Sequence, residues 1–129
     1  MSRNRILIVD DEPAIREMVA VALELADFDV LEAENAQRGH EIIVDERPYL
    51  VLLDEPSEGV APVIVEQMAH MILELKEQGV SILLSEQNMH FAELVSDRAY
   101  VLEKGQIRYQ ASMEQLAANE EVRRAYLSV

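Results

Sequence analysis

Residues 49–59 read YLVLLDEPSEG, and this stretch decides the fold class of the chain. Residues 49–53 form a short, continuously apolar run, which is typical of a parallel strand covered by helices on both faces. Two carboxylates, Asp54 and Glu55, follow the run directly and are themselves followed by a turn with proline and glycine. Open α/β sheets bind their ligands at the carboxyl ends of the strands. The two acids therefore stand where a ligand site is expected.

Outward from this stretch, short apolar runs alternate with helical patterns along the whole chain. Further strands are expected at residues 5–9, 30–33, 80–84, 99–102 and, after a turn, 106–109. Helices are expected at residues 13–26, 35–46, 62–79, 89–96 and from 112 onward. Ser112 and Gln115 form a capping-box pattern for the last helix, which breaks or restarts near Asn119. This alternation predicts a parallel sheet with helices on both faces.

The length and composition describe one globular domain over residues 1–129. Half of the residues are hydrophobic, 28% are charged, and the formal net charge is −14. That charge argues against a nucleic-acid partner, whose phosphates require a basic face. No apolar run approaches the roughly 18–20 residues of a membrane helix, and the amino terminus has no signal-peptide pattern. The absence of cysteine excludes disulfides and thiolate metal sites and fits a cytoplasmic protein.

The first half, residues 3–54, resembles a response-regulator receiver domain. The resemblance is carried by ILIVDDEPAIREMV at 6–19, VLEAEN at 30–35 and RPYLVLLD at 47–54. It implies that Asp10, Asp11 and Asp54 hold Mg²⁺, a hard ion that suits clustered carboxylates, and that Asp54 accepts a phosphoryl group. The alternative is an acidic, solvated sheet end without a bound ion.

The second half, from about residue 50 to 129, resembles an ABC-transporter ATPase of the branched-chain amino-acid type. The matching text is LVLLDEPSEGVAPVIVEQM at 50–68 and ELKEQGVSILLSEQNMHFAELVSDRAYVLEKGQI at 74–107. In that family residues 50–55 form the Walker B strand. The resemblance implies that Asp54 helps to hold Mg²⁺, that Glu55 polarises the attacking water and that Gln87 approaches the γ-phosphate region.

Two departures from the ABC pattern argue against ATP hydrolysis. The four glycines stand at positions 39, 59, 79 and 105, so no G-x-x-x-x-G-K-[ST] loop exists to cradle phosphates. The family's signature motif before Walker B is replaced by receiver-like sequence. We therefore expect no bound nucleotide and no enzyme activity, and we interpret Glu55 as a surface acid beside a turn.

The joined chain rebuilds a receiver site only in part. Ser85 directly follows the run at 80–84, where a receiver has its hydroxyl, but a turn residue is an equal interpretation. Lys104 follows the next strand without the receiver's Lys-Pro pair, and the register can place Glu103 there instead. The loop after Asp54 lacks the family's Met-Pro. Ser85 and Lys104 are thus accessory candidates for phosphorylation of Asp54.

These patterns predict a flavodoxin-like three-layer α/β sandwich with sheet order 2-1-3-4-5 and residues 106–109 as an edge hairpin strand. The change of family at residues 52–54 favours an engineered hybrid scaffold, with residues 1–54 receiver-like and 55–129 ABC-like, that binds Mg²⁺ weakly. A natural recombinant is the alternative origin, and a receiver phosphorylated on Asp54 or a nucleotide hydrolase are the alternative functions. The sequence indicates no biological partner, but the last helix offers a face for a homodimer. Its residues are Leu116, Val122, Tyr126 and Leu127.

Overall fold

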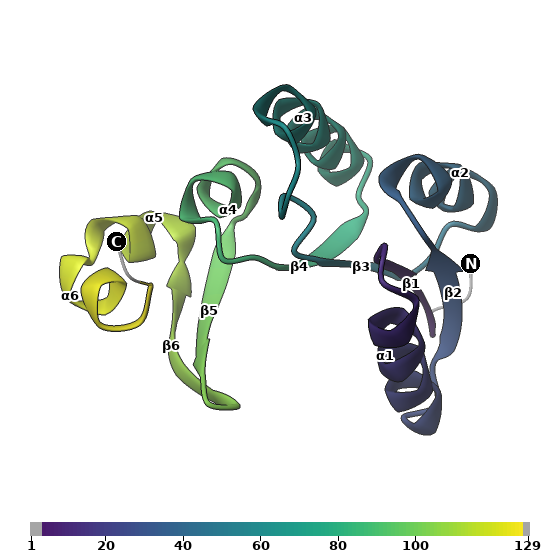
Figure 1. Cartoon of the computed structure of the whole chain (residues 1–129), viewed down its shortest axis with the longest axis horizontal. Helices are drawn as coiled ribbons and strands as arrows, with labels where there is room; N and C mark the ends of the chain where they lie inside the picture. The colour runs from purple at the N-terminus through teal and green to yellow at the C-terminus, as the bar shows by residue number, and fades with distance from the viewer. Residues whose placement is uncertain (1–3, 128–129) are drawn as a thin grey trace. The chain divides into compact units, whose positions relative to one another are not determined.

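The computed structural model describes residues 4–127, and its contacts divide the chain into two compact units. Unit 1 is Met1–Ser85 and unit 2 is Glu86–Val129 (Figure 1). The sequence predicts a single domain over 1–129, so the structure adds a subdivision immediately after the fourth strand. No helix within residues 4–127 combines the length and the apolar character needed to cross a bilayer.

Unit 1 is a parallel four-stranded sheet with helices on both faces. Its strands lie in the order β2-β1-β3-β4, and Figure 1 shows α1 on one face and α2 and α3 on the other. The α/β class and the order of these four strands are confirmed. The elements in chain order are β1 (Arg5–Val9), α1 (Pro13–Leu25), β2 (Asp29–Ala33), α2 (Ala36–Glu46), β3 (Leu50–Asp54), α3 (Pro62–Glu77) and β4 (Ser81–Ser85).

The core of unit 1 centres on β1 and β3, the two inner strands. Leu7 and Ile8 of β1 are almost fully buried, as is Val51 of β3, because parallel strands inside such a sheet are covered on both faces. β3 pairs with β1 on one side and with β4 on the other. The stretch where the two family resemblances meet is therefore an inner strand of a single sheet.

Helix α2 shows how local sequence fixes an element of this unit. Asn35 caps the helix, and its side chain accepts a hydrogen bond from the Arg38 amide at 2.8 Å. Gly39, which weakens the helical pattern in the sequence, lies against β1. A Cβ atom at this position would come within 2.9 Å of Cγ2 of Val9. The glycine thus allows α2 to approach the sheet closely.

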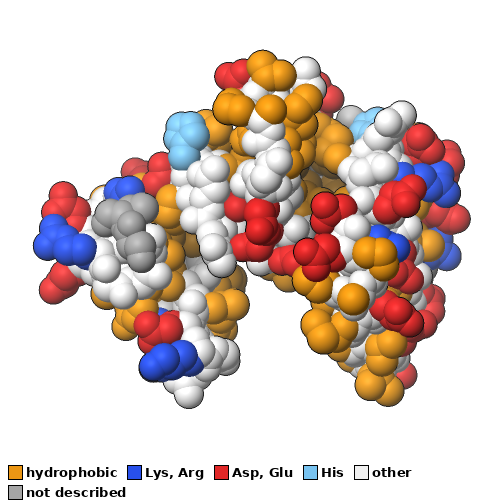
Figure 2. All heavy atoms as spheres, in the orientation of Figure 1, with side chains coloured by type: hydrophobic (Ala, Val, Ile, Leu, Met, Phe, Trp, Pro, Cys, Tyr) orange, Lys and Arg blue, Asp and Glu red, His pale blue; other side chains and the backbone are white. Residues whose placement is uncertain are grey.

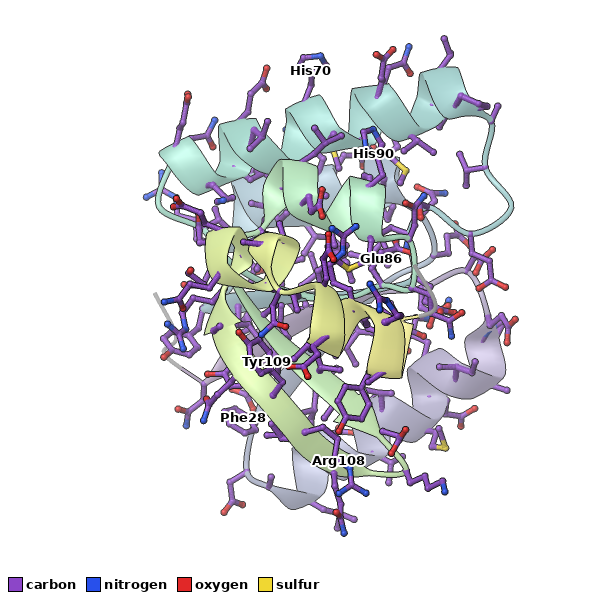
Figure 3. The ribbon with its side chains drawn as sticks, turned by 90° about the vertical axis from the view of Figure 1, so that its left-hand side faces the viewer. Phe28, His70, Glu86, His90, Arg108 and Tyr109 are labelled. Atoms are coloured by element: carbon purple, nitrogen blue, oxygen red, sulfur yellow. The ribbon has the colours of Figure 1, made fainter. Side chains whose placement is uncertain are left out.

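Unit 2 is a β-hairpin packed against short helices. Its elements are α4 (Met89–Val95), β5 (Arg98–Glu103), β6 (Gln106–Ser112), α5 (Met113–Ala118), α6 (Glu120–Val122) and a π-helical turn η1 (Arg123–Leu127). Lys104 and Gly105 form the hairpin turn. Both have positive φ, as a two-residue turn of type I′ requires. The pairing shifts from Val101↔Tyr109 to Leu102↔Ile107, which makes Arg108 a bulge. Figure 3 shows Arg108 and Tyr109 on this hairpin.

The predicted place of the fifth strand is wrong. β5 pairs antiparallel with β6 in a separate two-stranded sheet, and β4 is the last strand of the parallel sheet. The predicted hairpin itself is confirmed, because β5 pairs with β6 across the two-residue turn at Lys104. The burial of β5 accounts for the missing pairing with β4. Val101 is buried whereas Tyr100 and Leu102 are exposed, which is the alternation of a strand with one solvated face.

The carboxyl-terminal helical segment is divided as the sequence predicts. Ser112 and Gln115 form the capping box of α5, and the next helical turn begins after Asn119. Leu116 is 2% exposed and forms the core of unit 2 with Val101 and Met113. Of the four residues predicted for a dimer contact, Leu116, Val122 and Leu127 belong to this cluster, and Tyr126 is 38% exposed.

Candidate functional site at the carboxyl ends of β1 and β3

The sheet brings Asp10 and Asp54 together at the carboxyl ends of its two inner strands. The register of β1 and β3 ends at Val9↔Leu53, so Asp10 and Asp54 occupy the next aligned positions at the carboxyl ends of the two strands. Asp10 is buried and Asp54 is half-buried. The sequence prediction that these two acids stand at adjacent strand ends agrees with this register.

Asp10 has a buried carboxylate oxygen without a partner. Its side chain is held in an Asx turn, in which Oδ1 accepts the Glu12 amide at 2.9 Å. Its backbone N–H donates to the carbonyl of Ala33 at 3.1 Å, so the residue is fixed between β1 and β2. Oδ2 is buried and accepts no hydrogen bond within residues 4–127. An unsatisfied buried acceptor costs about 1–3 kcal/mol, and a cation or a water molecule would remove that penalty.

The third predicted acid is not gathered with these two. Asp11 is exposed, and within residues 4–127 no three His, Cys, Asp or Glu side chains are grouped so that they could hold a metal ion. Figure 2 shows several acidic side chains gathered between α3 and α1 on the viewed face of unit 1. The Mg²⁺ site at Asp10, Asp11 and Asp54 stays a prediction.

Arg16 is a site residue that the sequence interpretation missed. Its Nη1 donates to the backbone carbonyl of Asp10 at 2.8 Å, and its Nε donates to Glu32 Oε1 at 3.1 Å. It therefore ties the end of β1 to β2 through the first turn of α1. A signal was present in the sequence, because Arg16 is the only lysine or arginine between positions 6 and 37.

The loop after β3 is set by the backbone of Glu55. Glu55 has φ 44, in the left-handed region that non-glycine residues rarely adopt. Its amide donates to the carbonyl of Ser85 at 2.6 Å, so this turn is tied to the end of β4. Ser57, two residues later, is 8% exposed. Together these contacts make the segment after Asp54 an ordered turn at the carboxyl edge of the sheet.

The two accessory candidates differ in placement. Ser85 is the register partner of Asp54 in the β3–β4 pair, so the hydroxyl candidate lies beside the acid that it would assist. Lys104 lies in the turn of the β5–β6 hairpin, which belongs to unit 2. Unit 1 by itself therefore supplies Asp10, Asp54 and Ser85, and the lysine comes from the other unit.

The comparisons with known proteins divide between two families. Over 54 residues the chain is 65% identical to the phosphate regulon transcriptional regulatory protein PhoB of Pseudomonas aeruginosa. Over 81 residues it is 47% identical to the branched-chain amino acid transport ATP-binding protein BraG of the same species, and over 80 residues it is 35% identical to the lipopolysaccharide export ATP-binding protein LptB of Haemophilus influenzae. The first two matches together exceed the chain length of 129 residues by six, so they overlap.

These matches are partial on both sides. The PhoB match covers 42% of this chain and 24% of PhoB, the BraG match covers 63% and 35%, and the LptB match covers 62% and 33%. The chain thus spans about a third or less of each of these curated relatives. No protein-family model matches the chain.

Solved structures show the same division. The response regulator TrrA of Thermotoga maritima, in complex with Mg²⁺ and BeF, is 31% identical with a TM-score of 0.54, and the match covers 68% of this chain and 73% of that one. A chemotaxis response regulator of Vibrio cholerae has a TM-score of 0.51 at 20% identity, covering 64% and 68%. A nucleotide-free ATP-binding cassette from an ABC transporter has a TM-score of 0.55 at 21% identity, covering 92% and 51%. The last two show the fold alone, and the flavodoxin-like α/β class is confirmed.

Proposed function

We propose that this chain is a hybrid scaffold without catalytic activity. It is a chimera, in which a segment of the response-regulator receiver family is joined to a segment of the ABC-transporter ATPase family. It keeps a weak divalent-cation site at Asp10 and Asp54. An engineered fusion and a recombination of two genes of one genome both produce such a chain. The observation that carries the cation site is the buried Oδ2 of Asp10, which accepts no hydrogen bond within residues 4–127.

The donor set fits Mg²⁺ better than softer ions. Carboxylate oxygens are the ligands that Mg²⁺ prefers, and the ion usually keeps several waters and takes one or two carboxylates. Asp10 and Asp54 are two such ligands at adjacent strand ends. The related response regulator TrrA was solved with Mg²⁺ and BeF, which supports the same preference here. When bound, the ion neutralises the charge of the two carboxylates.

The chain's own residues prepare this edge for a cation. The Asx turn holds one oxygen of Asp10 against the Glu12 amide and leaves the other without a partner. Arg16 donates to the backbone carbonyl of Asp10 rather than to its carboxylate. Its hydrogen bonds therefore leave Oδ2 of Asp10 open to a cation.

A second candidate function is acceptance of a phosphoryl group by Asp54. It is favoured by Ser85, which lies beside Asp54 in the register of β3 and β4. It requires a cation or a hydrogen-bond donor to stabilise the negative charge that develops on the phosphoryl oxygens, and the candidate lysine, Lys104, belongs to unit 2. Incubation with a small phosphodonor and Mg²⁺, followed by intact mass measurement, tests it. A gain of one phosphoryl group that Asp54→Asn abolishes would support this function over the inert scaffold.

The cation site is tested by thermal melts at increasing MgCl₂, each compared with KCl at the same ionic strength. At a concentration of ten times the dissociation constant, binding to the folded state alone adds about 1.4 kcal/mol, which raises Tm by roughly 3–6 °C. Asp54→Asn should melt higher than the parent without metal, because one repelling charge is gone, and should lose most of the Mg²⁺ response.

Asp45→Asn is the matched control, because Asp45 is an exposed acid of α2 in the same unit. It removes the same charge from unit 1 and should keep the full Mg²⁺ response. If the parent melts at the same temperature in MgCl₂ and in matched KCl, or if Asp45→Asn loses as much response as Asp54→Asn, no specific site exists.

A further inference from the structure

β4 is an edge strand that carries neither a charged residue nor a proline. Within residues 4–127 it pairs with β3 on one side and with no strand on the other. Its sequence, Ser81 to Ser85, is SILLS, with no charge and no proline. The opposite edge of the sheet, β2, carries Asp29 and Glu32. Natural edge strands avoid pairing through charges, prolines and bulges, so the two edges of this sheet differ in their capacity to accept another strand.

The register defines which backbone groups of β4 face outward. The carbonyl of Ser85 accepts the Glu55 amide and thus points toward β3. Backbone groups alternate in direction along a strand, so Ile82 and Leu84 direct their N–H and C=O groups to the open edge. Four hydrogen-bonding groups are available there. The side chain of Leu83, between them, is 53% exposed.

The sequence of β4 is nearly symmetric about Leu83. We propose that a second copy of this chain pairs with this edge in antiparallel orientation, with the two-fold axis passing between the two Leu83 residues. Ser81 then lies opposite Ser85 of the other copy, and Ile82 lies opposite Leu84. In an antiparallel pair, opposed residues alternate between those that exchange two hydrogen bonds and those that exchange none. Ile82 and Leu84 become the bonded pairs, which is what their outward groups require.

The side chains on the exposed face fit this arrangement. Leu83 is aligned with Leu52 of β3, so pairing produces a continuous row of four leucines across the two sheets. At a non-bonded position the Cα atoms of opposed residues are about 4.5 Å apart and their side chains are close. A register shifted by one residue would lose this row, because the side chains would change faces.

The charge of the chain sets the conditions for this dimer. Each copy carries −14, whereas β4 itself carries none, so the contact is neutral and the surrounding repulsion is long-range. Salt screens such repulsion over about 10 Å at 0.1 M. A pair of five-residue strands is also smaller than a standard interface of roughly 1,600 Å². The dimer should therefore be weak at low salt and should tighten by on the order of tenfold at high salt.

Disulfide trapping tests the register directly, because the chain has no cysteine of its own. Leu83→Cys places two thiols on the axis, within the Cα separation of about 4.4–6.8 Å that a disulfide needs. Ser81→Cys alone places them about 14 Å apart along the strands. In a mixture of the Ser81→Cys and Ser85→Cys variants, a dimer of one copy of each places the two thiols opposite each other. Under mild oxidation, Leu83→Cys and the mixture should form dimers at least tenfold faster than Ser81→Cys alone.

Two further variants complete the test. Val44→Cys is the control for random collision, since Val44 is 59% exposed on α2 of the same unit, and Tyr126→Cys reports on a dimer through the carboxyl-terminal helical segment. Sedimentation velocity of the unmodified chain at low and high salt gives the oligomeric state without thiols. Leu83→Lys should shift this equilibrium toward monomer by on the order of tenfold, because it opposes two like charges. A chain that stays monomeric at all salt concentrations, or a Leu83→Cys rate equal to that of Val44→Cys, overturns the proposal.

Discussion

Replacement of Gly39 by alanine should destabilise unit 1, although alanine is the better helix former. Gly39 lies inside α2, and Gly→Ala in a helix interior normally adds about 1 kcal/mol of stability. Here the new Cβ would come within 2.9 Å of Val9 Cγ2, while its next neighbours, Val9 Cγ1 and Ala33 Cβ, are at ordinary distances of 3.7 and 3.8 Å. Val9 is 9% exposed on an inner strand. Overpacking at such a site costs about 1–3 kcal/mol, so the net loss should be about 0–2 kcal/mol.

The clash involves one side chain, so a double-mutant cycle isolates it. Val9→Ala alone removes two buried methyl groups and should lower the free energy of unfolding by about 2 kcal/mol. In that background Gly39→Ala meets no clash and should raise stability by about 1 kcal/mol. The two substitutions should therefore couple by about 1–3 kcal/mol. Urea denaturation followed by far-ultraviolet circular dichroism gives all four values, and equal effects of Gly39→Ala in both backgrounds would refute the close-approach argument.

Three other substitutions test separate parts of the chain. Asn35→Ala removes the side-chain acceptor of the Arg38 amide and should lower the free energy of unfolding, measured by urea denaturation, by about 1 kcal/mol. Asn35→Asp keeps an acceptor and should lose much less; equal losses in the two variants would contradict the capping role. Leu116→Ala should destabilise unit 2 by about 2–5 kcal/mol, because Leu116 is 2% exposed. Leu102 is 67% exposed, so Leu102→Ala should change the stability of unit 2 by less than about 0.5 kcal/mol. Hydrogen exchange of unit 2 amides distinguishes these two outcomes. ATP hydrolysis, measured as phosphate release, should equal the buffer background; turnover that disappeared in Glu55→Gln would show that the inert-scaffold proposal is wrong.

The sequence predicted unit 1 well because its signals are local and agree with one another. The apolar run at 49–53 appears as β3, one residue later, and Pro13 and Pro62 begin α1 and α3. Asn35 caps α2 as expected. In each case propensity, capping and burial indicate the same element, and such consistency makes boundaries readable.

The place of β5 could not be predicted in the same way. Residues 99–102 form a continuous apolar run, which is typical of a strand buried on both faces, yet Tyr100 and Leu102 are exposed and only Val101 is buried. An apolar residue at the surface has no signature in a single sequence. The hairpin with residues 106–109 was predicted and forms, whereas the additional parallel pairing with β4, which the receiver resemblance favoured, is absent among the described strands. Arg16 was missed because neither of its contacts, with the Asp10 carbonyl and with Glu32, belongs to a sequence motif.

The two family segments of this chain combine into one sheet more readily than into one active site. A parallel sheet is held by backbone hydrogen bonds, and β3 can pair with β1 from one family and with β4 from the other without any requirement on side-chain identity. Catalysis has no such tolerance, because each group must stand within hydrogen-bond reach of the reacting atom. The receiver-like segment supplies Asp10 and Asp54, and the ABC-like segment supplies a serine in register with Asp54 but places its lysine in unit 2. Neither family's phosphate-handling set is complete within unit 1. A sheet can thus be assembled from two families at a shared strand, because strand pairing requires only backbone groups in register.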